Sequence, residues 1–64
     1  MIDRETIAAV EVEMERLAGR IAVLRALATD PDRPLFYFPR ETGAIRRASM
    51  DLTRALADLR RSER

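Results

Sequence analysis

The side chains best suited to chemistry in this sequence are arginines, which supply every basic residue of the 64-residue chain because it contains no lysine. Arginines recur every seven residues in the C-terminal half, at Arg40, Arg47, Arg54 and Arg61, with Arg46 and Arg60 beside them. On a helix this spacing makes a basic ridge along one side. Guanidinium groups bind phosphate and carboxylate through paired hydrogen bonds, although arginine in place of lysine is also typical of G+C-rich genomes.

The basic ridge has two interpretations. In the first, it pairs across an antiparallel helix contact with the acidic residues Glu11, Glu13 and Glu15, as flanking charges do in coiled coils. In the second, it binds nucleic acid or a phosphate-bearing ligand where a helix N-terminus adds backbone N–H donors. The residues of this anion site would be Arg40, Thr42, Gly43, Arg46 and Arg47. In an oligomer, symmetry would gather such arginines from several chains at a site between subunits.

Catalytic and metal-binding residues are scarce. The chain has no histidine and no cysteine, which removes the usual proton-transfer group, the usual thiol nucleophile and the commonest metal ligands. Asp30 and Asp32 flank a proline, a pattern typical of a turn rather than of a calcium loop. We therefore expect no enzyme activity, no cofactor and no metal site.

Every aromatic residue falls in one short segment, Leu35-Phe36-Tyr37-Phe38, bounded by Pro34 and Pro39. One interpretation is that the segment packs over the end of the helices or across an oligomer. Tyr37 would then face outward, because alternation along an extended segment opposes it to Phe36 and Phe38. Another is that Phe36, Tyr37 and Phe38 anchor a protein partner, because aromatic side chains dominate interface hot spots. A third is a short strand that pairs with another chain.

A line of small and apolar residues runs along the N-terminal half, roughly opposite its main hydrophobic stripe. We call this line the small-residue seam: Val12, Gly19, Val23 and Ala26, with Ala9 beyond it and Arg16 interrupting it. A helix in a simple hairpin needs only one apolar face. The seam therefore predicts contact with a further helix and self-association.

Two long helices must position these surfaces, and we expect the main apolar stripes of the two helices to hold the hairpin together. The main stripe of the first follows alternating steps of three and four: Ile7, Val10, Met14, Leu17, Ile21, Leu24 and Ala28. Asp3 can cap its start and Pro31 ends it. The second has one face formed by Ile45, Ala48, Leu52, Ala55, Leu56 and Leu59, with Ser49 and Ser62 joining it. Its start is open between Pro39 in the first turn and Thr42 as the cap.

These observations predict an all-α, antiparallel two-helix hairpin in a single domain, 1–64, with helices over about 3–28 and 39–62 and an aromatic loop over about 29–38. A chain this short, without disulfides or metal, needs partners, so we expect a coiled-coil-like homo-oligomeric helical bundle. We expect a non-enzymatic interaction protein: an adaptor, inhibitor or assembly component. No signal peptide or membrane span is visible, so we expect a cytoplasmic protein with no membrane contact. Its small size and arginine content suggest a bacterial or phage origin.

Overall fold

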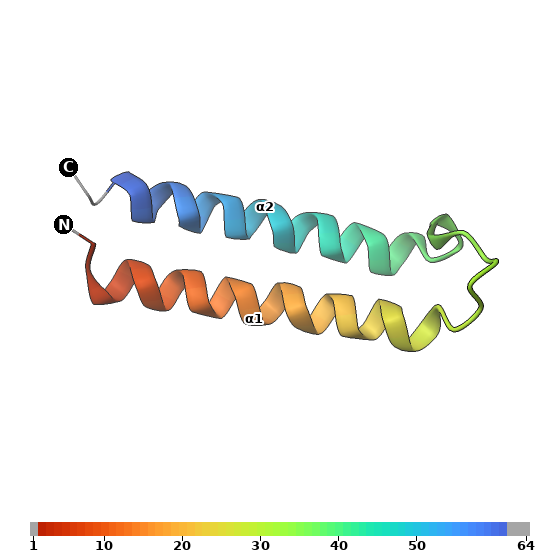
Figure 1. Cartoon of the computed structure of the whole chain (residues 1–64). Helices are drawn as coiled ribbons and strands as arrows, with labels where there is room; N and C mark the ends of the chain where they lie inside the picture. The colour runs from red at the N-terminus through yellow and green to blue at the C-terminus, as the bar shows by residue number, and fades with distance from the viewer. Residues whose placement is uncertain (1, 62–64) are drawn as a thin grey trace.

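The computed structural model describes residues 2–61, with the backbone alone for Phe36. Helix α1 spans Arg4–Leu27, helix α2 spans Pro39–Arg61, and a 3₁₀ turn, η1 (Leu35–Tyr37), lies between them. The two helices pack antiparallel along their length (Figure 1), and the Cα atoms extend over 47 × 16 × 15 Å. The all-α helical hairpin that the sequence predicts is confirmed, while Ser62, the last residue expected in the second helix, lies outside the described residues.

Asp3 begins α1 as the sequence predicts. Its backbone is extended, and its carboxylate accepts a hydrogen bond of 2.8 Å from the backbone N–H of Thr6, one of the donors that the first turn leaves without a partner. The Thr6 hydroxyl donates to the carboxylate and to the carbonyl oxygen of Asp3, each at 3.0 Å. The hydrogen bond from the Thr6 N–H lowers the pKa of the Asp3 carboxyl, because it favours the charged form.

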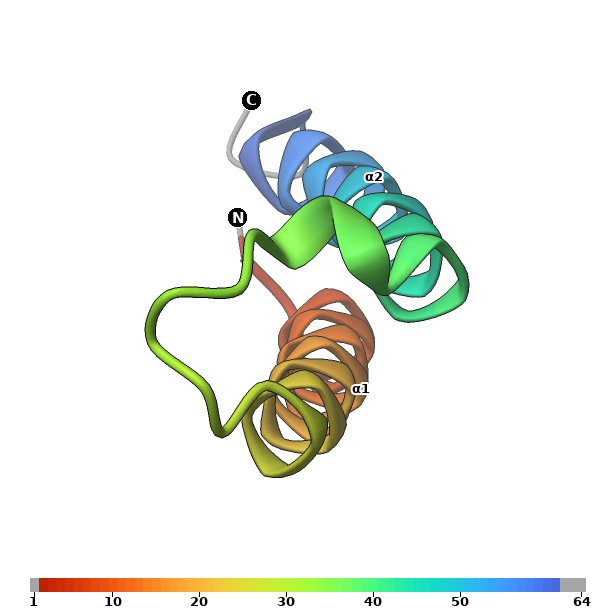
Figure 2. The ribbon, with the colours of Figure 1, turned by 90° about the vertical axis from the view of Figure 1, so that its right-hand side faces the viewer.

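The loop leaves the end of α1 through a turn built on Asp30. Its carboxylate accepts a 3.0 Å hydrogen bond from the backbone N–H of Asp32, and its carbonyl accepts one of 3.1 Å from that of Arg33. The chain then bows out to one side of the helix pair and returns through η1, which packs against α2 (Figure 2). The strand considered for the aromatic segment is thus wrong, because its backbone closes 3₁₀ hydrogen bonds instead of remaining extended.

Pro39 opens α2, which resolves the two starts that the sequence left open. Proline suits the first helical position because its missing N–H would have no partner there. Thr42 lies inside the first turn and does not cap it. Its backbone N–H donates to the carbonyl of Phe38 at 3.0 Å, and its hydroxyl donates to the carbonyls of Phe38 and Pro39 at 3.1 and 3.3 Å.

The core between the helices is thin. Its buried residues are Val10 and Leu24 on α1 and Ala48 and Ala55 on α2. Half-buried side chains surround them: Thr6, Glu13, Leu17, Ala44, Ile45, Asp51, Leu52, Leu56 and Leu59. The alanines that α2 presents let the helix axes approach closely, but they contribute little apolar area.

The stripe of α1 is only half covered, which corrects the expectation that all of it holds the hairpin together. Val10, Leu17 and Leu24 face α2, whereas Ile7, Met14 and Ile21 remain 44%, 55% and 36% exposed. The stripe consists of two columns of residues spaced by seven. These columns are separated by about 60° around the helix, and one neighbouring helix covers only one of them.

The Asp3 cap makes the stability of the hairpin depend on pH. The pKa of Asp3 is lowered on folding, so its stabilising effect is present at neutral pH and is lost as the pH falls below about 4. We expect Asp3→Ala to lower the melting temperature at pH 7, measured by circular dichroism. Asp3→Asn keeps a good cap without a titrating group.

The difference in melting temperature between the parent and Asp3→Asn isolates this effect from the other carboxylates. We expect the parent to be the more stable at pH 7 and to lose that advantage at pH 2.5. An equal difference at both pH values would show that the charge of Asp3 contributes nothing to the cap.

Candidate functional site

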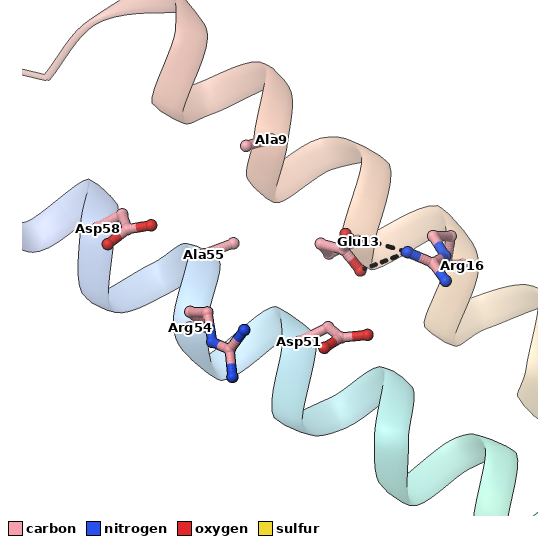
Figure 3. A pocket seen from close by; sticks show the side chains of 7 residues that line it. All are labelled: Ala9, Glu13, Arg16, Asp51, Arg54, Ala55 and Asp58. Carbon is pink, nitrogen blue, oxygen red and sulfur yellow. Dashed lines mark hydrogen bonds and ion pairs between the residues drawn. The ribbon is translucent and has the colours of Figure 1, made fainter.

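One side of the hairpin is charged, and shallow hollows lie along it between the helices. A hollow in the half of the hairpin toward the termini has a volume of about 320 Å³. Its walls are Ala9, Glu13 and Arg16 from α1 and Asp51, Arg54, Ala55 and Asp58 from α2 (Figure 3). Acidic and basic side chains are mixed here, with three carboxylates facing two guanidinium groups, so this end has no preference for an anion.

Toward the loop the same side becomes rich in arginine. A hollow of about 210 Å³ is lined by Arg16, Arg20 and Arg47, with Asp51 as its acidic residue. The next, of about 190 Å³, is lined by Arg20 and Arg40 with Glu41, Val23 and Ala44. We call Arg16, Arg20, Arg40 and Arg47 the arginine cluster. It is open to solvent and gathers four arginines from two helices on one side, with Arg16 also paired to Glu13, an arrangement that suits a phosphate or carboxylate.

The structure separates the residues expected for the anion site. Arg40 and Arg47 lie on the charged side, seven residues apart on one face of α2. Arg46 is exposed and is not among the residues that line these hollows. Gly43 is not among them either, and the hydroxyl of Thr42 is already bonded to backbone carbonyls of its own helix turn.

Within the described part of the chain, none of the ion pairs considered across the helix contact is formed. Among residues 2–61, the ion pair is that of Arg16 with Glu13, at 3.3 Å within α1 (Figure 3). Glu13 faces Arg54 across the 320 Å³ hollow without pairing with it. A pair of this kind, three residues apart on an exposed helix face, stabilises the helix by about 0.2–0.5 kcal/mol. Charge pairing therefore does not set the register of the two helices.

The small-residue seam is exposed along α1. Val12 and Val23 are each about half exposed, and Gly19 and Ala26 are exposed. Gly19 and Val23 line a hollow of about 250 Å³ on α1 itself, with Glu15, Arg16 and Arg20. A Cβ atom added to Gly19 would have no neighbour within 4 Å, so packing inside the hairpin does not require glycine there. Contact of the seam with a further helix stays a prediction.

The aromatic segment is partly exposed. Tyr37 is 62% exposed and carries the Arg33 guanidinium 5.8 Å above the centre of its ring, a cation–π contact. Leu35 is also exposed, while Phe38 is half-buried beside the start of α2. The outward position expected for Tyr37 is confirmed, although the 3₁₀ turn produces it and not the alternation of an extended segment. The side chain of Phe36 lies outside the description.

The chain matches no protein-family model, and no curated protein or solved structure is detectably similar to it. Within residues 2–61, neither helix is sufficiently apolar to cross a lipid bilayer. The described residues also contain no group of three acidic, histidine or cysteine side chains arranged to hold a metal ion.

The contribution of α1 to the charged side is the feature that sequence reasoning missed. In the sequence, Arg16 is identified only as an interruption of the seam, and no pattern singles out Arg20. They join Arg40 and Arg47 because their positions on α1 flank the column that faces α2. The sequence would place Arg16 and Arg20 correctly if only one column of the stripe, Val10, Leu17 and Leu24, were assigned to the contact with α2. The other column then points away from α2.

The two helix glycines provide a matched test of the seam. A Cβ atom has open space at both Gly19 and Gly43, and alanine favours a helix over glycine by about 0.5–1 kcal/mol. We expect Gly19→Ala and Gly43→Ala each to raise the melting temperature by several degrees. If Gly19→Ala alone lowers the molar mass in solution, a second helix contacts the seam closely at Gly19.

Proposed function

We propose that this chain is a non-enzymatic interaction protein that acts through helical self-association and partner binding, as an adaptor, inhibitor or assembly component. The observation that carries the proposal is the number of large apolar side chains left exposed on the hairpin. They are Ile2, Ile7, Val12, Met14, Ile21, Val23, Leu27, Leu35, Tyr37 and Met50. Ile7, Met14 and Ile21 lie along one face of α1, and an exposed apolar face on a small protein marks a site of interaction.

The thin core supports the same proposal. No described side chain is fully buried, and the buried apolar set contains two alanines. Chains of this size that lack disulfides or metal usually gain stability by association, because the apolar area they bury barely offsets the entropy of folding. With no cysteine and no histidine in the sequence, partner chains remain the available source of stability.

The loop provides a separate surface for a partner of different sequence. Leu35 and Tyr37 present apolar and aromatic area at the end of the hairpin, and Arg33 lies against the Tyr37 ring. Tyrosine and arginine are enriched at the centre of interfaces. The loop therefore supports partner binding that does not compete with association along the helices.

The proposal is tested by measuring molar mass with light scattering over a concentration series, with circular dichroism on the same samples. We expect a helical species whose mass is a fixed multiple of 7.3 kDa. A fully helical monomer at all concentrations would overturn self-association. A monomer with little helix would show that the folded form depends on a different protein.

The arginine cluster supports a second candidate function, a small regulator that binds nucleic acid or another phosphate-bearing ligand. Arg40 and Arg47 of the expected site lie on the charged side, where Arg16 and Arg20 join them. Arg46, the third arginine of the expected site, lies outside these hollows. The separation of Arg46 from Arg47 makes these adjacent residues a matched pair of substitutions.

We expect Arg47→Gln to weaken the binding of a fluorescent ATP analogue and of a labelled short DNA duplex, and Arg46→Gln to leave it nearly unchanged. Affinity for the duplex should fall steeply with salt, because the contacts are to phosphates. Absence of binding by the parent at low salt, or equal losses in both variants, would overturn the arginine-cluster site.

A further inference from the structure

The side of the hairpin opposite the charged hollows is apolar. On each helix, the charged side chains that line the hollows lie to one side of the line of contact between α1 and α2. Side chains on the other side of that line point to the opposite face of the hairpin. On α1 these are Ile7, Met14 and Ile21, all exposed. On α2 they are Ile45, Leu52, Leu56 and Leu59, all half-buried. We call these seven residues the apolar flank.

The surface area of the chain is large enough to include a stable dimer interface. A compact monomer of 7.3 kDa exposes about 4,200 Å² by the usual scaling with mass, whereas this chain exposes 5432 Å². The excess, roughly 1,200 Å², exceeds the ~800 Å² that each partner contributes to a standard stable interface. A partner as long as the hairpin itself would cover it.

We propose that a second copy of this chain covers the apolar flank, with each helix running antiparallel to its own counterpart across a twofold axis that passes beside Ala18 and Ser49. The result is a four-helix bundle. This inference rests on the proposed self-association and deepens it by assigning the face and the geometry.

The apolar residues fit this geometry on both helices. An antiparallel pairing of α1 about Ala18 brings Met14 to within one residue of the level of Ile21 of the second copy, and Ile21 likewise beside its Met14. A pairing of α2 about Ser49 brings Ile45 against Leu52 of the second copy in the same way. Small residues at the axis, an alanine and a serine, allow the facing helices to approach.

The two pairings are compatible with one axis. Helix α1 begins level with the end of α2 and ends level with its start (Figure 1). Ala18 therefore lies level with the turn of α2 that contains Ser49. One twofold rotation of the hairpin therefore produces the pairing of α1 and the pairing of α2 at the same time, as an isologous dimer requires.

Charge complementarity favours this arrangement over the parallel one. Glu11 and Arg25 border the flank at equal distances along α1 from Ala18. The twofold axis places Glu11 against Arg25 of the second copy, and Arg25 against its Glu11, so two ion pairs form per dimer. A parallel arrangement would instead lay α1 over α2 of the second copy. Glu11 would then face Leu56 and Arg25 would face Thr42, so neither would face an opposite charge.

The chain has no native cysteine, which makes the axis directly testable by crosslinking. A residue on a twofold axis meets its own copy, so we expect Ala18→Cys and Ser49→Cys each to form a covalent dimer on oxidation or with a short bismaleimide. Asp58→Cys, at the exposed edge of the charged side, is the control and should remain monomeric on denaturing gels. Crosslinking between Ala18→Cys and Ser49→Cys chains in a mixture, with neither crosslinking alone, would establish the parallel arrangement and overturn the proposal.

A matched pair of methionines tests the face without crosslinking. Met14 is 55% exposed and lies on the apolar flank, whereas Met50 is 63% exposed and lies outside it. We expect Met14→Glu to weaken dimerisation at least about tenfold by light scattering, since it places a charge in an apolar interface, and Met50→Glu to leave it unchanged.

The outcomes separate this inference from the function beneath it. A parent chain that is monomeric at every concentration would remove the proposed self-association itself. An oligomeric parent whose mass survives Met14→Glu, and whose Ala18→Cys variant does not crosslink, would overturn this face and geometry alone. The self-association would then have to use another surface, the small-residue seam first.

Discussion

The packing of one column of α1 against one face of α2 is the contact on which the rest of this structure depends. Val10, Leu17 and Leu24 supply the column, and Ala48 and Ala55 supply the centre of the opposing face. Alanines bring the helix axes close, but they bury little area. The hairpin is thus defined by a narrow contact, which leaves most of both helices available to other molecules.

This narrow contact divides the molecule into two unlike sides. Residues rotated one way around the helices are arginines and carboxylates, and they line open hollows in which Arg16 and Glu13 form an ion pair within α1. Residues rotated the other way are isoleucine, leucine and methionine. Charged side chains are favourably hydrated, so the first side is stable in contact with water. Apolar side chains are not, so the second side gains free energy when another apolar surface covers it.

Local signals in the sequence were sufficient to predict the helices, their order and their antiparallel pairing. The Asp3 cap, the heptad spacing of α1 and the prolines at the loop each act within a few residues. The division of the α1 stripe could not be predicted in the same way. Whether Ile7 and Met14 are buried depends on how many helices surround α1. A stripe of two columns fits a helical bundle better than an isolated pair of helices.

The candidate site was predicted only in part for the same reason. Arg40 and Arg47 were identified from their spacing along one helix, but Arg16 and Arg20 join them through the rotation of α1 in the contact. Arg46 was included because it adjoins Arg47 in sequence, yet neighbours on a helix point about 100° apart. In the loop, alternation along an extended segment was assumed for residues that form the 3₁₀ turn η1.

The two sides also determine how the two candidate functions relate to each other. If a second copy covers the apolar flank, the charged sides of the two chains face outward on opposite surfaces of the bundle. The dimer would then present two separate arginine clusters and would not merge them into one site between subunits. Each cluster would keep the arrangement it has in a single hairpin, so anion binding would be non-cooperative in the absence of a conformational change. Dimerisation would supply the stability that the thin core lacks, while recognition of an anion or a protein would use the charged side and the loop.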